Sequence, residues 1–191
     1  VTWVKATRLP GSERSLVSGT NASDFGRFRR GIELPASESL GLVEDHEGAG
    51  WVGSRGDGLC RLREGRVERW DTSRGFPGSF ALPVLADESG ALWAISSSGI
   101  VRRRAERFEW IGPGQGAPRD LVFGLVEDSH GGFWLPGGHG IHRLTRADLE
   151  AVLDRRRPRT ANLTLGLRDG MLTPECSAAA MPSAARLADG S

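Results

Sequence analysis

The sequence lacks several features that would place it directly in a functional class. None of its apolar runs approaches the roughly 18 residues that a membrane-spanning helix requires. Its 25 basic and 24 acidic residues leave a formal net charge of +1, so there is no overall field to attract or repel nucleic acid. The N-terminus, Val1 to Lys5, has neither an initiating methionine nor the zones of a signal peptide. We therefore expect these 191 residues to be an interior piece of a longer chain.

Cysteine is also scarce, and lysine is almost absent. Cys60 and Cys176 are the only thiols, too few for the disulfide framework of a small secreted domain, so they do not identify the redox compartment. We expect both to be small residues packed in strands or loops, and their oxidation state stays open. Arginine carries the positive charge, and 27 glycines favour many tight turns.

What the sequence does contain is a repeat. Tryptophan recurs at almost equal intervals, as Trp51, Trp93 and Trp134. Each tryptophan ends the same Asp-x-x-Gly-x-x-Trp phrase, which begins at Asp45, Asp87 and Asp128. A second glycine keeps the same interval, at Gly58, Gly99 and Gly140. Self-similarity at a period of about 40 residues indicates one repeated supersecondary unit, in which no copy buries its apolar face alone.

The middle copy of the repeat predicts four short strands. An apolar stretch suits a buried strand, and a glycine-containing turn separates it from a second strand around Trp93. A third strand begins apolar and becomes charged, and a fourth alternates polar and apolar residues. We expect these strands at 80–87, 91–95, 100–104 and 107–110. Four such strands per repeat are typical of a propeller blade, with the tryptophans wedged between blades.

We therefore predict an all-β chain, a β-propeller fragment whose blades of four antiparallel strands recur about every 41 residues. A degraded blade is expected at about 1–38, further blades at about 39–79, 80–120 and 121–182, and the start of another at about 183–191. Closing a ring typically takes about four to eight complete blades, so the first and last edges should be open.

One repeat departs from the pattern. After Leu144, apolar residues at 149, 152 and 153 have helical spacing, Thr145 can cap the start, and Pro158 would stop the helix. This predicts a helical insertion near 146–157, between the third and fourth strands. In the same repeat we expect a first strand at 121–127 and a second strand that ends at Pro136, because proline donates no ladder hydrogen bond.

Two phrases of the repeat carry a family resemblance. One is Leu42-Val43-Glu44-Asp45 followed by Gly48 and Trp51-Val52-Gly53, and the other runs from Gly124 to Trp134. Together with the tail at 170–176 and 182–184, they resemble the two-component regulator propeller repeat over roughly residues 40–190. The resemblance implies the periplasmic, extracytoplasmic part of a bacterial membrane-bound receptor. A transmembrane helix and a histidine kinase, diguanylate cyclase or transcription-factor output would then follow downstream.

From this resemblance we expect a ligand-sensing module that is not itself an enzyme and holds no cofactor; any kinase or cyclase activity would lie in downstream sequence. The implied partners are a small-molecule ligand, the remaining blades, the signalling region and a second receptor copy, but no nucleic acid. Carbohydrate is suggested as the ligand by family analogy alone. Two alternatives stay open. An interaction scaffold would expose a large apolar patch, and a lyase similar to streptogramin lyases would need a channel-lining histidine, glutamate and metal-binding carboxylate.

Several motifs invite chemical interpretations that their context does not favour. Each Asp-x-x-Gly turn offers one or two oxygens where Ca²⁺ takes about six to eight, so we interpret these phrases as hairpin turns. His139 and His142 have no further zinc ligand near them in the sequence. The segment 112–116 lacks the Lys-Ser/Thr ending of a phosphate loop and is expected to connect two blades. The arginine runs 102–104 and 155–157 are expected at solvated edges.

Function in a propeller belongs to loops at one face, held by a rigid scaffold. The turns between second and third strands and the links between blades should share such a face. They supply our candidate ligand-binding residues, which are Arg55, Asp57, Arg74, Ser97, Ser98, Gln115, Arg119 and His139. We predict no catalytic set and no metal site.

Overall fold

Three four-stranded antiparallel sheets follow one another in the computed structural model, which describes residues 4–5, 17–18, 39–64, 66–87 and 89–176. The first sheet contains β3 (Ser39–Glu44), β4 (Gly50–Ser54), β5 (Leu59–Arg63) and β6 (Arg66–Trp70). The second contains β7 (Ala81–Ala86), β8 (Leu92–Ser96), β9 (Gly99–Arg104) and β10 (Arg107–Ile111). The third contains β11 (Val126–Glu127), β12 (Gly132–Gly137), β13 (Gly140–Thr145) and β14 (Leu163–Leu165). The predicted all-β character and its four-stranded antiparallel unit are confirmed.

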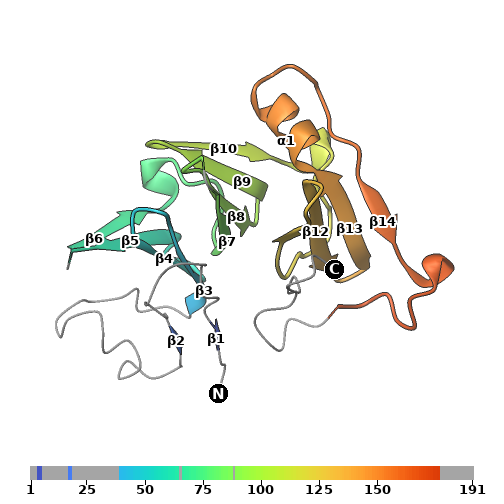
Figure 1. The fold of residues 1–191 in the computed structure, drawn as a ribbon, viewed down its shortest axis with the longest axis horizontal. Helices are drawn as coiled ribbons and strands as arrows, with labels where there is room; N and C mark the ends of the chain where they lie inside the picture. Colours follow the sequence, from blue (N-terminus) through green and yellow to red (C-terminus); the bar gives the residue numbers. More distant parts are fainter. Residues whose placement is uncertain (1–3, 6–16, 19–38, 65, 88, 177–191) are drawn as a thin grey trace.

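The sheets lie side by side in an open arc (Figure 1). Strands β3 and β7 lie next to each other on the inner side of the arc, and the fourth strands β6, β10 and β14 lie on its outer side. A one-turn 3₁₀ helix follows each sheet, as η1 (Thr72–Arg74), η2 (Pro113–Gln115) and η3 (Leu167–Asp169). From the first predicted blade only the pair β1 (Val4–Lys5) and β2 (Val17–Ser18) is described, and 183–191 lies outside the described residues. The blade boundaries therefore stay predictions.

The repeated phrase builds the same hairpin in every sheet. Asp45 Oδ1 accepts hydrogen bonds from the backbone N–H groups of Glu47 and Ala49, at 3.0 and 2.9 Å, and its Oδ2 accepts one from the Trp51 indole at 2.8 Å. Asp87 and Asp128 repeat all three contacts, with indole distances of 3.0 and 2.7 Å. Both carboxylate oxygens are thus used within the hairpin. The interpretation of these phrases as hairpin turns is confirmed.

Two of the tryptophans pack between consecutive sheets. Trp51 is 1% exposed and stacks on Trp70, in a cluster that includes Leu92 and Val101 of the second sheet. Trp93 is fully buried and meets Phe133 of the third sheet edge-on, with ring centroids 5.1 Å apart. Trp134 is only half-buried, and no described sheet follows it. The tryptophan spacing therefore marks the junctions between sheets.

An arginine from the later part of the chain covers each of these buried tryptophans. Arg103 of β9 lies 4.6 Å from the Trp51 ring centroid and 5.2 Å from that of Trp70. Arg146 lies 5.5 Å from the Trp93 ring. Such cation–π contacts contribute most where both groups are withdrawn from water.

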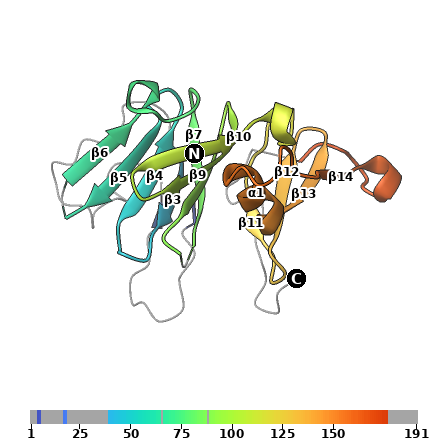
Figure 2. The ribbon, with the colours of Figure 1, turned by 90° about the horizontal axis from the view of Figure 1, so that it is seen from above.

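Helix α1 (Arg146–Leu153) is the predicted insertion between the third and fourth strands of the last sheet. Thr145 caps it by accepting a hydrogen bond from the Asp148 backbone N–H, as expected. The helix is shorter than the predicted 146–157, because Arg155 takes a φ of 59° and so leaves helical geometry before Pro158. Leu149 and Val152 pack into the cluster of the second and third sheets, and Figure 2 shows α1 in the angle between those sheets.

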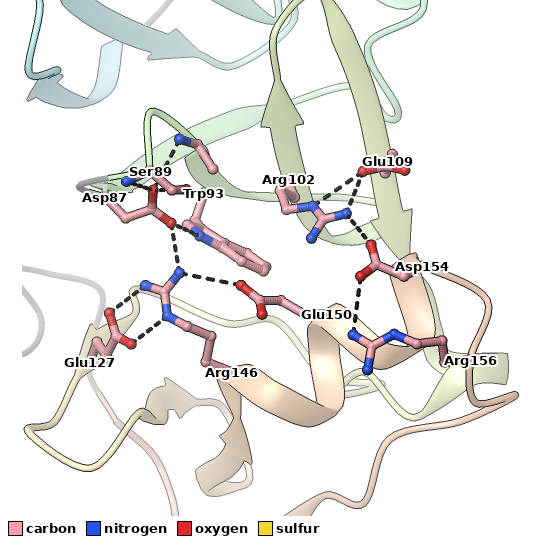
Figure 3. A network of polar contacts seen from close by, with 11 residues as sticks. Asp87, Ser89, Trp93, Arg102, Glu109, Glu127, Arg146, Glu150, Asp154 and Arg156 are labelled. Atoms are coloured by element: carbon pink, nitrogen blue, oxygen red, sulfur yellow. Dashed lines mark hydrogen bonds and ion pairs between the residues drawn. The ribbon is translucent and has the colours of Figure 1, made fainter.

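Two arginines attach this helix to the second sheet (Figure 3). Arg146 donates to Asp87 Oδ2 at 2.6 Å and to both Glu127 oxygens at 2.6 and 2.5 Å. Arg102, whose side chain is 2% exposed, pairs with Glu109 at 2.7 Å and with Asp154 after the helix at 3.0 Å. The predicted solvated edge at 102–104 is therefore wrong for Arg102 and Arg103, because β9 packs both against neighbouring groups.

The Asp87 contacts predict a loss of stability in acid. Burial alone would raise the pKa of Asp87, but hydrogen bonds from Ser89, Arg146 and Trp93 bring it down from 3.8 to about 2. A lowered pKa gives stability that is complete above the unfolded value and lost as pH falls through the folded one. We expect the urea midpoint to decrease between about pH 4 and pH 2. Asp87→Asn should be less stable at neutral pH and less pH-dependent in this window; an unchanged pH profile would contradict the assignment.

The first strand of the third sheet is shorter than predicted. The expected strand at 121–127 is regular only at β11, with an isolated bridge between Val122 and Gly137. Pro136 does not end β12, which continues to Gly137 with Pro136 opposite Ile141 of β13. The Pro136 carbonyl points away from β13 and accepts a hydrogen bond from the Phe123 N–H. The N–H and C=O of one strand residue point to the same side, so the N–H that proline lacks would also have faced Phe123. The proline therefore weakens the pairing with 121–125 and leaves the β13 pairing intact.

Cys60 and Cys176 are unpaired, and burial raises the pKa of the Cys60 thiol. Cys60 is a packed strand residue, as expected. Among the described residues, no helix has the length and apolar character that crossing a membrane requires.

Candidate functional site

A cleft of about 240 Å³ opens between the β8–β9 turn and the chain that enters the third sheet. Its apolar lining includes Phe80, Ile95, Ile100 and Val122. Its polar lining comes from Ser96, Ser97, Arg119 and Asp120. Two of the residues predicted from turns and links, Ser97 and Arg119, thus line one cleft. Their role in binding a ligand stays a prediction.

A serine pair attaches the two neighbouring turns to the edge of this cleft. Ser97 Oγ accepts a hydrogen bond from the Ser79 backbone N–H at 2.8 Å and a longer one from the Ser79 hydroxyl at 3.3 Å. The Ser79 carbonyl accepts from the Gly56 N–H at 2.9 Å, beside the bridge between Arg55 and Phe80. The predicted turn residue Arg55 therefore lies next to a cleft-lining residue.

Asp120 organises the other side of the cleft. Its Oδ2 accepts a hydrogen bond from the His139 backbone N–H at 2.9 Å, and its Oδ1 lies 2.8 Å from His142 Nε2. Asp120 is thus the acidic group that lies beside this buried ring nitrogen. Burial would raise the pKa of Asp120, but the His139 N–H and His142 together lower it. Asp120 therefore stays a carboxylate whose two oxygens already have partners.

His142 extends this arrangement to the last strand. Its side chain is 6% exposed, and its Nδ1 lies 3.0 Å from Thr164 Oγ1 of β14. The His139 ring, by contrast, is 84% exposed. The described residues contain no group of three or more His, Cys, Asp or Glu side chains placed to hold a metal ion. The pair of histidines is accounted for by the Asp120 and Thr164 contacts.

The remaining predicted residues do not line the cleft. Arg74 donates to the Arg69 carbonyl at 2.7 Å and covers the Trp70 ring. Gln115 Oε1 accepts from the Gly112 N–H at 3.3 Å, inside the η2 turn that joins the second sheet to the third. Ser98 donates its backbone N–H to Ser96 Oγ, and Asp57 is a half-buried residue of the β4–β5 turn. The predicted connecting role of 112–116 is confirmed.

Sequence reasoning missed Asp120, and it considered His142 only as a metal ligand. The repeat could have pointed to Asp120. It follows Ser79 at the repeat interval, the one that also separates Gly140 from Gly99, and Ser79 and Asp120 each precede the first strand of a sheet. Both positions bond to the turn between the second and third strands of their own sheet. Aligning the copies at this position would have identified the residue, although not its contact with His142.

No protein-family model matches the sequence, and no curated protein sequence matches it. Solved structures do match. The extracellular domain of a hybrid two-component system from B. thetaiotaomicron superposes with a TM-score of 0.61 at 14% identity, covering 83% of this chain and 21% of that one. The extracellular domain of a one-component system from the same organism gives 0.58 at 17% identity, covering 72% and 20%. PorZ, a surface component of the type-IX secretion system of Porphyromonas gingivalis, gives 0.50 at 11% identity, covering 69% and 22%.

These similarities establish a shared fold. The chain spans about a fifth of the length of each of these proteins. Since these proteins belong to different systems, the fold alone does not assign a role to this chain.

Proposed function

We propose that this chain is part of a β-propeller in the extracytoplasmic sensing region of a bacterial signal-transduction receptor, where it binds a small molecule and performs no catalysis. The observation that carries the proposal is the succession of three sheets with identical Asp–Trp hairpins, in a fold shared with extracellular domains of two receptor systems. The repeated phrases that resemble the two-component regulator propeller repeat support the same assignment.

The packing between sheets supports a propeller. Each blade of a propeller is a four-stranded sheet that buries its face against the next, around a common axis. Here Trp51 and Trp93 fill the junctions between successive sheets, and the first strands β3 and β7 lie on the inner side of the arc. Further blades from the rest of the receptor would complete the ring. The kinase, cyclase or transcription-factor output would also lie elsewhere in that receptor.

The cleft beside Ser97 and Arg119 is the proposed ligand site. It joins two sheets, so a ligand bound there contacts both. A ligand that binds one arrangement of these sheets more tightly than another would shift the receptor between states by that difference in affinity. This gives the module a physical route from binding to signalling.

Topology reporters test the cellular side of the proposal. The parent gene is truncated after Ser191 and fused either to alkaline phosphatase, which is active only outside the cytoplasm, or to β-galactosidase, which is active only inside it. We expect an active phosphatase fusion and an inactive galactosidase fusion. The opposite pattern would refute an extracytoplasmic sensor.

A further inference from the structure

We propose that the cleft binds a small monocarboxylate, with the carboxylate on Arg119 and Ser97 and an apolar body on the floor of the cleft. The inference rests on the proposed function in one respect, that this cleft is the ligand site. It adds the chemical class of the ligand.

Arg119 supplies the anion-binding group. It lines the cleft, its side chain is exposed, and the described residues offer it no hydrogen-bond or ion-pair partner. Most other arginines near the sheet junctions are engaged, as with Arg102 and Arg146. An unengaged guanidinium presents a planar fork of donors that matches the two oxygens of a carboxylate.

Ser97 supplies a second donor on the opposite side. Its Oγ accepts a hydrogen bond from the Ser79 backbone N–H at 2.8 Å, which leaves the Ser97 hydroxyl proton free to turn toward an acceptor in the cleft. An arginine fork and a hydroxyl proton in one cleft select a ligand with acceptor oxygens. They disfavour a ligand whose polar groups are donors.

The neighbouring carboxylate limits the charge that the ligand can carry. Asp120 also lines the cleft, and its pairing with the His139 N–H and His142 holds its oxygens but does not remove its negative charge. The Arg119 cation beside the partly compensated Asp120 carboxylate suits a ligand that carries a single negative charge. A doubly charged phosphate would be repelled by Asp120, and Arg119 is the one lysine or arginine among the described residues that line the cleft.

The floor of the cleft determines the rest of the ligand. Ile95, Ile100 and Val122 are between 2% and 7% exposed, and Phe80 also lines the cleft. A sugar ring would place hydroxyl groups against these side chains without partners, at a cost in desolvation. The volume of about 240 Å³ exceeds the roughly 150 Å³ of an apolar cavity known to bind benzene, so it suits a short-chain or small aromatic acid.

Titration of the purified chain tests the inference. The probes are butyrate, 3-methylbutyrate and benzoate. Butyramide is the uncharged control for butyrate. Inorganic phosphate, glucose and glucuronate represent the other ligand classes, a doubly charged anion, a neutral sugar and an acidic sugar. Binding is followed by isothermal titration calorimetry and by NMR shifts of the tryptophan indoles. We expect the three monocarboxylates to bind more tightly than butyramide, phosphate or either sugar.

Two variants locate the site. Arg119→Ala should weaken binding of the monocarboxylates by about 10- to 100-fold, the range for losing a charge-assisted hydrogen bond. Ser97→Ala should weaken it by a smaller factor. Arg66→Ala, on the exposed outer strand β6, is the matched control and should leave binding unchanged. Far-UV circular dichroism and thermal melting verify that each variant is folded.

The outcomes separate the inference from the proposed function. Monocarboxylate binding that Arg119→Ala leaves unchanged, or an absence of binding by all three acids, would overturn the inference. Tight binding of glucose or another neutral probe would also overturn it, while leaving a ligand-binding module intact. The proposed function fails separately, if the reporter fusions place Ser191 in the cytoplasm.

Discussion

Replacing Arg146 with alanine is expected to lower the free energy of unfolding by about 2–4 kcal/mol. Arg146 pairs at once with Asp87 of the second sheet and Glu127 of the third, at 2.6 and 2.5 Å. Its removal leaves two carboxylates, 9% and 22% exposed, facing each other without this cation. It also uncovers the Trp93 ring. The expected value lies below that of a fully buried pair, because the Arg146 side chain is itself 23% exposed.

Arg156→Ala is the control for this prediction. Arg156 pairs with Asp154 just beyond the same helix, but the two side chains are 63% and 39% exposed. Its loss should therefore change stability by no more than about 0.5 kcal/mol. Urea denaturation of both variants gives the comparison. Equal effects of the two substitutions would show that Arg146 contributes only as an ordinary surface charge.

Gly99→Ala is expected to destabilise the protein by about 2–5 kcal/mol, through strain and overpacking together. Gly99 begins β9 with a φ of 126°, which side-chain-bearing residues rarely adopt. A Cβ built there would lie 2.1 Å from the Ile111 carbonyl oxygen, at the end of β10. That oxygen belongs to the backbone of a paired strand, so it cannot move aside cheaply. Gly58 and Gly140 occupy the same place in their sheets, which accounts for the second glycine repeat.

Gly114→Ala provides the matched control for Gly99. Gly114 lies in η2, a Cβ there meets nothing within 4 Å, and its φ is not positive. Substitution at this site should leave the denaturation midpoint within experimental error or raise it slightly, because alanine restricts the unfolded chain. A Gly99→Ala variant as stable as Gly114→Ala would mean that the β10 end can relax away from the turn.

The features that the sequence predicted well are local and periodic. The Asp–Trp hairpins depend on residues within six positions of each other, so their spacing in the chain is also their spacing in space. The start of α1 was predictable for the same reason, since Thr145 and Asp148 are close neighbours in the chain. Its end was not, because Arg155 carries no signal for a positive φ. Pro136 was misjudged because its effect depends on which side of the strand the missing donor faces.

The candidate site was predictable only in part, because its contacts cross between elements. Turn positions identified Ser97 and Arg119, which the fold brings to one cleft. The contact of Asp120 with His142 joins a link to the middle of β13, with β11 and β12 between them in the chain, and depends on the register of a hairpin that the sequence does not specify. The salt bridge from Arg146 to Asp87 depends on how two sheets meet. Arg74 was selected by its position in a link, yet its contacts belong to packing on Trp70.

The placement of Arg103 and Arg146 has a consequence for cooperativity. Each completes the environment of a tryptophan that belongs to an earlier part of the chain. Contacts between neighbouring sheets therefore contribute much of the stability, as interfaces between neighbouring repeats do in a linear array. The middle sheet takes part in two junctions and each outer sheet in one among the residues described, so fraying should propagate inward from the ends.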